Sequence, residues 1–252
     1  MTHSTDVVRS LLASTAQQGR GIATRGHRQQ PQQPLELYEM EGCPFCRLVR
    51  EALTDLDLDV ISYPCPKGGD RYRPLVERLG GKQMFPYLMD PNTGTALYES
   101  SDIIDYLYRE YGHKPAPRRW LVRSVRTAAA IAASLPRANR GIHHQPARVP
   151  DQTLILYSFE ASPFARLVRE RLTELQLPFL TRQCGRDQWQ DWLMPGMRER
   201  LGMQYRPSQR NRKELLERAG TIAIPYLVDP NTGTELFESK AILDYLDTTY
   251  AA

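Results

Sequence analysis

Apolar and polar residues follow two different spacings along the chain, and their order predicts a mixed sheet covered by helices. Residues 35–38, 60–63 and 87–89 are short apolar runs typical of strands, and residues 96–98 follow a turn signal at 90–94 that predicts a hairpin. Residues 45–56, 73–79 and 101–111 carry apolar side chains at helical spacing. Helix-joined parallel strands followed by a hairpin are typical of an α/β fold.

The same series of elements occurs twice. The segment that begins at Leu35 returns at Leu154, 119 positions later, and the segment that begins at Pro86 returns at Pro225, 139 positions later. The second copy therefore carries about twenty extra residues between its two matching blocks. We divide the chain into a leader helix and linker (1–34), a first domain (35–112), a basic linker helix (113–152) and a second domain (153–252) with an insertion at 185–212.

Each domain follows a leader helix with one apolar stripe. Residues 11–22 resemble residues 131–142, so the leader belongs to the repeating unit. An isolated helix of this length is marginal in water, so we expect both leaders to dock onto the domains or onto each other. The stripes expected to face inward are Val8, Leu11, Leu12 and Thr15 in the first leader and Leu121, Val125, Ala128 and Ala132 in the second.

Composition favours a globular protein in a reducing compartment. The chain has 252 residues, of which 41% are apolar and 25% charged, and this composition can bury one large core or two small ones. The longest apolar stretch, 128–135, is too short to span a bilayer, and the N-terminal residues lack the apolar core of a secretory signal. Four cysteines are too few for a disulfide scaffold of this size, which favours the cytoplasm.

Two cysteines form the motif Cys43-Pro44-Phe45-Cys46 between the first predicted strand and the first predicted helix. A thiol at the start of a helix faces unpaired backbone N–H groups and the positive end of the helix dipole, which favours the reactive thiolate. A pair of buried structural cysteines is the alternative interpretation. Beside a βαβ pattern, a Cys-x-x-Cys motif favours redox chemistry, with Cys43 as nucleophile and Cys46 placed to resolve a mixed disulfide.

The order of elements and three motifs resemble a known family. Cys-Pro-Phe-Cys at the first turn, Phe85-Pro86 before the third strand and Glu99-Ser100 before the last helix are similar to the thioredoxin-like, glutathione-binding N-terminal domain of glutaredoxins and glutathione transferases. The resemblance implies an α/β fold of two tandem thioredoxin-like domains, each preceded by a leader helix. The all-helical C-terminal domain of the transferases is missing from this pattern.

The resemblance also implies a glutathione site in the first domain. Pro86 should follow a cis peptide bond, so that the backbone of Phe85 pairs with the cysteine part of glutathione. Glu99 and Ser100 should hold the γ-glutamyl carboxylate of glutathione at the start of the last helix. For Ser100, a plain helix N-cap is the alternative.

The second copy changes the first motif and keeps the other two. Ser162-Pro163-Phe164-Ala165 replaces both thiols and resembles the serine form of the transferase motif. Ser162 either hydrogen-bonds glutathione or is the remnant of a lost active site. The remaining positions expected to bind glutathione there are Ile224, Pro225, Glu238 and Ser239. We therefore expect redox chemistry in the first domain and, at most, binding in the second.

Two further thiols, Cys65 and Cys184, follow the second strand of each copy. Cys65 is expected on the active-site edge of the sheet, as an accessory thiol that forms a disulfide with Cys43 or as a buried small residue. No metal site is expected, because zinc prefers four ligands and the first domain offers three thiols without a well-placed histidine.

The insertion at 185–212 is basic and contains Trp189, Trp192 and Tyr205. Such a segment either contacts nucleic acid or forms a lid or wall of the second glutathione site, and its position directly after Cys184 favours the lid or wall. The basic linker at 113–150 either attracts an anionic partner or is a packed helix with a solvated charged face, which is the simpler view.

These observations predict a glutathione-dependent thiol–disulfide oxidoreductase that acts through Cys43 on a disulfide or electrophilic substrate. One alternative is a glutathione transferase or isomerase in which Ser162 or Cys43 presents the glutathione thiolate. The other is a glutathione-binding scaffold without catalysis. Nucleic acid and a membrane span are not expected, and the oligomeric state stays open.

Overall fold

The structure is a computed structural model that describes residues 3–15, 20–25, 30–117, 137, 140–193 and 195–252. The stripe expected on the second leader, at 121–132, lies outside the described residues. No described helix combines the length and the apolar composition that a membrane crossing requires.

The first unit of the repeat forms the predicted series of elements, with ends within two residues of the predicted ones. Residues 90–94 form the expected turn: the backbone N–H and the side-chain amide of Asn92 both donate to Asp90, and Gly94 takes a φ of +71°. The elements are β1 (Leu35–Glu39), α2 (Pro44–Leu56), β2 (Val60–Pro64), α3 (Arg73–Gly80), β3 (Tyr87–Asp90), β4 (Thr95–Tyr98) and α4 (Ser100–Glu110).

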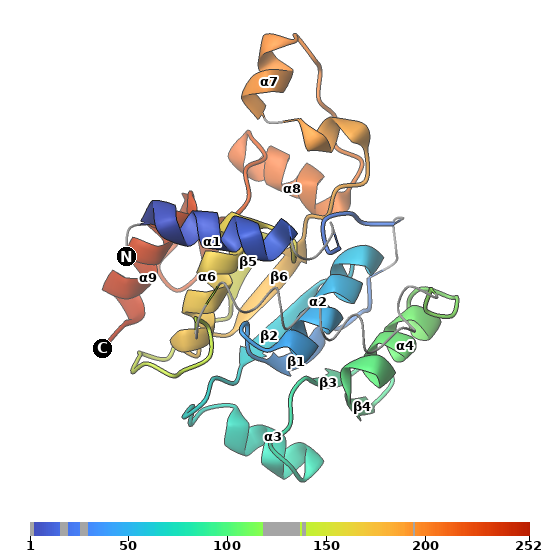
Figure 1. The fold of residues 1–252 in the computed structure, drawn as a ribbon, viewed down its shortest axis with the longest axis vertical. Coiled ribbons are helices and arrows are strands. Elements are labelled where there is room, and N and C mark those ends of the chain that lie inside the picture. The colour runs from blue at the N-terminus through green and yellow to red at the C-terminus, as the bar shows by residue number, and fades with distance from the viewer. Residues whose placement is uncertain (1–2, 16–19, 26–29, 118–136, 138–139, 194) are drawn as a thin grey trace.

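The second unit repeats this order and adds two short helices within the insertion, η3 and α7. Figure 1 shows α7 at one extremity of the molecule and α3 at the opposite extremity. The elements are β5 (Leu154–Ser158), α6 (Pro163–Glu174), β6 (Phe179–Gln183), η3 (Trp189–Trp192), α7 (Pro195–Arg200), α8 (Arg210–Ala219), β7 (Tyr226–Asp229), β8 (Thr234–Phe237) and α9 (Ser239–Tyr250).

The two units share one eight-stranded sheet of order β4-β3-β1-β2-β6-β5-β7-β8 (Figure 1). Strands β2 and β6 pair antiparallel, with Ile61 opposite Leu180 at the centre. These two residues are equivalent in the repeat, so the units are related by an approximate two-fold axis through this pair. The sequence predicted two sheets but not that they join.

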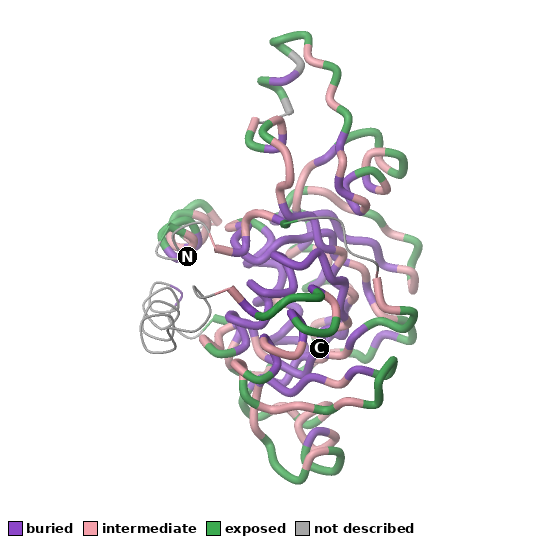
Figure 2. Tube along the Cα trace, turned by 90° about the vertical axis from the view of Figure 1, so that its right-hand side faces the viewer, coloured by how far each residue is buried: buried purple, intermediate pink, exposed green. Residues whose placement is uncertain are grey.

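Helices cover both faces of the sheet. In β1, Leu35 and Leu37 belong to the core under α2 and α4, whereas Tyr38 belongs to the core under α3, because successive strand residues point to opposite faces. The second unit repeats the arrangement, with α6 and α9 over one face and α8 over the other. The buried residues run through the middle of the molecule, while the insertion is largely exposed or half-buried (Figure 2).

The first leader, α1 (His3–Thr15), docks onto α6 of the second unit, but through a different face from the predicted one. Ser10 and Ala13 are buried, whereas Val8, Leu11 and Leu12 are exposed. The Ser10 hydroxyl donates to the Pro163 carbonyl at 2.7 Å and the Ser14 hydroxyl donates to the Ala161 carbonyl at 2.8 Å. Small side chains let the helix approach the turn before α6 closely and satisfy its carbonyls, so the predicted stripe is wrong as a docking face.

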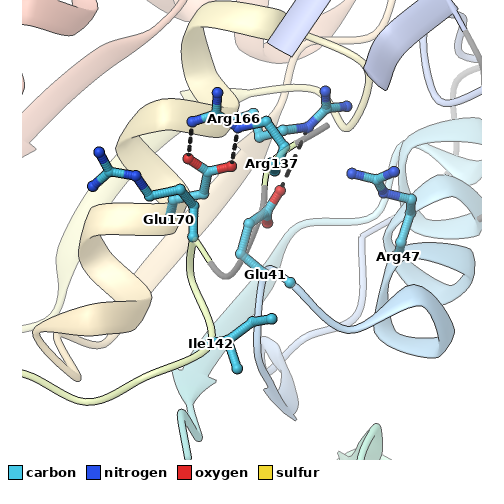
Figure 3. A pocket seen from close by; sticks show the side chains of 8 residues that line it. Glu41, Arg47, Arg137, Ile142, Arg166 and Glu170 are labelled. Carbon is cyan, nitrogen blue, oxygen red and sulfur yellow. Dashed lines mark hydrogen bonds and ion pairs between the residues drawn. The ribbon is translucent and has the colours of Figure 1, made fainter. Parts of the chain in front are cut away.

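Buried ion pairs join the two units on the face of the sheet that α2 and α6 cover. Arg50 Nε lies 2.8 Å from Glu160, and its repeat equivalent Arg169 places Nε 3.0 Å from Glu41. All four side chains are buried. Figure 3 shows two neighbouring pairs, Arg137 with Glu170 and Arg166 with Glu41. Each unit therefore supplies the counter-charge for a buried group of the other.

These contacts keep Glu160 ionised. Burial alone would raise its pKa, but the guanidinium groups of Arg50, Arg169 and Arg47 outweigh burial and lower the pKa of Glu160 to about 2. In Glu39, by contrast, burial dominates and raises the pKa despite the contact with Arg50. Glu160 is thus the carboxylate whose charge the interface stabilises most clearly.

We expect Glu160→Gln to lower the free energy of unfolding by about 3–5 kcal/mol at neutral pH, because the change leaves buried guanidinium groups without their counter-charge. The native pKa of Glu160 lies below its ordinary value of 4.5, so its contribution is present above pH 4.5 and is lost as the pH falls towards 2. Denaturant unfolding at several pH values should show the difference from wild type shrinking over that interval.

The matched control is Asp244→Asn, which removes an exposed ion pair with Lys240 and should change stability by about 0.5 kcal/mol or less. Equal effects of the two substitutions would contradict a structural role for the buried pairs.

Candidate functional site

Cys43 is the N-cap residue of α2. Strand β1 ends at Glu39, and after a short turn Cys43 adopts an extended backbone (φ −80°, ψ 121°), with its Sγ 3.4 Å from the backbone nitrogen of Cys46. Pro44 follows as the first helical residue, where its missing N–H costs nothing. Cys43 is half-buried and Cys46 is fully buried, so only the first thiol of the motif is within reach of a substrate.

The pKa values of the two thiols of the motif are shifted in opposite directions. A hydrogen bond from the Cys46 thiol is the largest of the effects that lower the pKa of Cys43 from 9.0 to about 7. Burial opposes this shift, whereas the backbone N–H groups of Cys46 and Phe45 and the charge of Arg50 add to it. Burial, followed by the interaction with Cys43, raises the pKa of Cys46. About half of Cys43 is therefore thiolate at pH 7, while Cys46 stays protonated and donates to it.

Both predicted cis peptide bonds, Phe85–Pro86 and Ile224–Pro225, are present. Tyr87 pairs with Tyr38, so Pro86 lies beside the end of β1, where the turn to Cys43 begins. The guanidinium group of Arg73 stacks over the Phe85 ring at 4.7 Å. The first-unit site thus combines the helix start at Cys43 with the Phe85–Pro86 turn that leads into β3.

The start of α4 has an unusual backbone. Glu99, not Ser100, occupies the N-cap position, with φ +63° and no side-chain hydrogen bond to the helix, so the N-cap alternative for Ser100 is wrong. Glu238 repeats this conformation with φ +66° before α9. A positive φ is uncommon for glutamate and clusters at functional positions. Neither the Glu99 nor the Glu238 side chain hydrogen-bonds to the helix that follows it. The starts of α4 and α9 therefore have no side-chain cap, as an anion site requires.

In the second unit, the predicted positions lie together in a cleft of about 600 Å³, with Ser162, Ile224, Pro225, Glu238 and Ser239 among its lining residues. The Ser162 hydroxyl accepts a hydrogen bond from the backbone N–H of Ala165 at 3.2 Å. Ser162 therefore has the position and the backbone donor that Cys43 has in the first unit.

The two units differ at the start of the last helix. Ser239 is 2% exposed, and its hydroxyl lies 3.4 Å from Nε2 of His3 in α1, whereas Ser100 is half-buried. Helix α1 also contributes Leu11 to the cleft. Nothing in the sequence pattern predicts that the leader of the first unit reaches the second site.

The insertion forms one wall of the cleft through Arg186, Asp191, Trp192, Leu193 and Arg198. The insertion is therefore a wall of this cleft, and its role in a glutathione site stays a prediction. The other two aromatic residues of the insertion do not line the cleft: Trp189 is 66% exposed, and Tyr205 packs behind Arg198, with the guanidinium group 3.8 Å from its ring centre.

Cys65 and Cys184 are completely buried in the cores under α3 and α8. The Cys65 thiol donates to the Tyr63 carbonyl at 3.4 Å, and burial raises the pKa of both thiols. Helix α2 lies on the other face of the sheet, so nothing here supports a disulfide between Cys65 and Cys43. Within the described ranges, no three His, Cys, Asp or Glu side chains are grouped to hold a metal ion.

Sequence reasoning missed the charges beneath the two turns. Glu41 and Glu160 stand two residues before Cys43 and Ser162, and each pairs with an arginine of the other unit. The available signal was the run Arg-Leu-Val-Arg-Glu, which occurs in both copies at 47–51 and 166–170. Identical charges kept on the same helix positions in two diverged copies indicate a shared contact.

The family described as "Glutathione S-transferase, N-terminal domain" matches residues 37–115 and 156–252. The chain belongs to this family. Both units are therefore glutathione S-transferase N-terminal-like domains of thioredoxin-like fold, and no all-helical domain is present among the residues described. No curated protein matches the chain.

One solved structure similar to this tandem glutathione S-transferase N-terminal-domain protein is "Leishmania TDR1 - a unique trimeric glutathione transferase". The identity is 13% and the TM-score 0.28, over 87% of this chain and 67% of that chain.

We expect the rate of alkylation of Cys43 by iodoacetamide to rise with pH through a midpoint near 7. In Cys46→Ala the midpoint should move up towards the ordinary thiol value of 9.0, because the largest contribution that lowers the pKa of Cys43 is lost. Mass spectrometry of the labelled peptide gives the rate, and the buried Cys65 and Cys184 should stay unlabelled in the folded protein. Identical midpoints in wild type and Cys46→Ala would contradict the proposed origin of the shift.

Proposed function

We propose that this protein is a glutathione-dependent thiol–disulfide oxidoreductase that works through Cys43. The observation that carries the proposal is the pair of thiols at the start of α2: an accessible Cys43 with its pKa lowered to about 7 and a buried, protonated Cys46 one turn inside. Glutathione as reductant also fits the small number of cysteines, which favours a reducing compartment.

The reaction begins with a disulfide that contains glutathione. The Cys43 thiolate attacks the glutathione sulfur, a Cys43–glutathione disulfide forms, and the substrate thiolate leaves. A second glutathione thiolate then attacks the glutathione sulfur, releasing glutathione disulfide and restoring the Cys43 thiolate. In the alternative second step, Cys46 attacks Cys43 Sγ, its proton passes to the leaving glutathione thiolate, and a Cys43–Cys46 disulfide forms.

The first-unit site has suitable groups for glutathione. The backbone of Phe85, before cis-Pro86, would pair with the peptide as an added strand does. The uncapped N–H groups at the start of α4, beside Glu99 and Ser100, suit the γ-glutamyl carboxylate. These contacts would hold the sulfur of glutathione over the start of α2.

A second candidate function is transfer of glutathione to an electrophile in the second unit. The observation in its favour is the cleft that contains Ser162, Ile224 and Pro225, where the serine hydroxyl would donate to a glutathione thiolate. Conjugation of 1-chloro-2,4-dinitrobenzene in wild type, lost in Ser162→Ala, would favour this candidate. Glutathione binding without either activity would favour a scaffold.

We expect Cys43→Ser to lower the reduction of the mixed disulfide of glutathione and 2-mercaptoethanol by at least about 100-fold, because the nucleophile is removed. Cys46→Ser should keep part of the activity, since external glutathione completes the cycle. The assay couples glutathione disulfide formation to NADPH oxidation by glutathione reductase. Full activity in Cys43→Ser would exclude the proposed function, and Cys65→Ala serves as the matched control because Cys65 takes no part in the cycle.

A further inference from the structure

The second-unit cleft has apolar walls from three segments. Phe159 and Phe164 flank the start of α6, Trp192 comes from the insertion, and Leu11 comes from α1. Phe164, Trp192 and Leu11 are 42%, 54% and 44% exposed, so part of each side chain is free to contact a ligand. The volume of about 600 Å³ is within the range of small-molecule sites.

The charged groups of the cleft are three arginines and two carboxylates: Arg186, Arg198, Arg212, Asp191 and Glu238. The Asp191 carboxylate lies 3.6 Å from Arg212 and accepts hydrogen bonds from the Tyr205 hydroxyl and from the backbone N–H groups of Asp187 and Gln188. Glu238 is exposed. Asp191 is thus already paired, and Glu238 is in contact with solvent. The two arginines of the cleft other than Arg212 are Arg186 and Arg198.

Arg198 is 6% exposed, and its Nε and Nη1 are buried without a hydrogen-bond partner. Stacking on Tyr205 at 3.8 Å holds its guanidinium group in place. Arg186 lies over the Trp192 ring at 4.6 Å, and its Nε also has no hydrogen-bond partner. Neither arginine lies within ion-pair distance of any carboxylate whose side chain the structure describes, a set that does not include Glu199. Buried charge without a partner is costly, so these two groups are suited to an anionic ligand.

The alternative place for an anion in this unit is partly covered. Ser239, the first residue of α9, is 2% exposed beneath His3, while its equivalent Ser100 in the first unit is half-buried. The first unit also has no counterpart of the insertion. The second unit therefore offers an anion the guanidinium groups of Arg186 and Arg198 in addition to a helix start.

We propose that the second-unit cleft binds an aromatic carboxylate or sulfonate, whose anionic group pairs with Arg198 and Arg186 while its ring packs among Phe159, Phe164 and Trp192. A guanidinium group matches the planar or forked geometry of such an anion with two parallel hydrogen bonds. The flat faces of the aromatic side chains match the ring. Binding does not depend on Cys43, so it goes beyond the proposed reductase function.

Isothermal titration calorimetry of the full chain with naphthalene-2-sulfonate and with neutral naphthalene-2-methanol tests the proposal. We expect the sulfonate to bind wild type at least about tenfold more tightly than the alcohol, as one charge-assisted pair implies. In Arg198→Met this preference should fall to about threefold or less, and Arg186→Met should reduce it in the same direction. Trp192→Ala should weaken both ligands, because it removes a ring contact and not the charge.

The matched control is Arg200→Met, which changes an exposed arginine on the same short helix and should leave the preference unchanged. Cys43→Ser should keep sulfonate binding while losing disulfide reduction, which separates this proposal from the reductase function. The proposal is overturned if wild type binds neither ligand, if it binds both equally, or if Arg198→Met and Arg186→Met, each folded by circular dichroism, both keep the wild-type preference.

Discussion

The buried carboxylate–guanidinium pairs across the β2–β6 seam are the constraint on which the rest of the structure depends. Arg50 and Glu160 are separated by 110 residues in sequence, and Arg169 and Glu41 by 128, so each pair forms only when both units are folded and docked. Separating the units would break these pairs at once and leave charged groups of both signs without their partners. The two copies therefore behave as one body, in the way that an isologous dimer does.

This seam also positions both site turns. Gly42 donates its backbone N–H to the carbonyl of Gly141, and Ala161 donates to the carbonyl of Gly21, at 3.1 and 3.0 Å. Each turn is thus held by the segment that precedes the other unit, while Glu41 and Glu160 anchor the same turns from beneath. The crossed arrangement explains why α1, which precedes the first unit, reaches the cleft of the second.

The local pattern of apolar and turn residues predicts the helices and strands of each unit but not how the two units assemble. The strands and helices of each unit follow from apolar spacing and turn residues, because neighbours in sequence decide them. The partner of Arg50 lies in the other copy, and no periodicity reveals it. The leader shows a second limit: its leucines satisfy the rule for an inward stripe, yet close approach to the turn at 161–163 selects Ser10 and Ala13 instead. Arg198 was missed because the insertion has no equivalent in the first copy to compare with.

The same turn supports different chemistry in the two units because Ser162 and Ala165 stand where the first unit has Cys43 and Cys46. Cys43 Sγ and Ser162 Oγ each lie near the backbone N–H three residues later, at 3.4 and 3.2 Å. Together with the hydrogen bond from the Cys46 thiol, which has the largest effect, the backbone donors lower the pKa of Cys43 to about 7. A serine hydroxyl stays neutral in the same place, and Ala165 has no thiol to donate as Cys46 does. The second turn therefore cannot exchange disulfides. What it retains is a helix start beside a cleft. The cleft residues that distinguish it from the first unit come from the insertion and from α1, which are segments outside the repeated core.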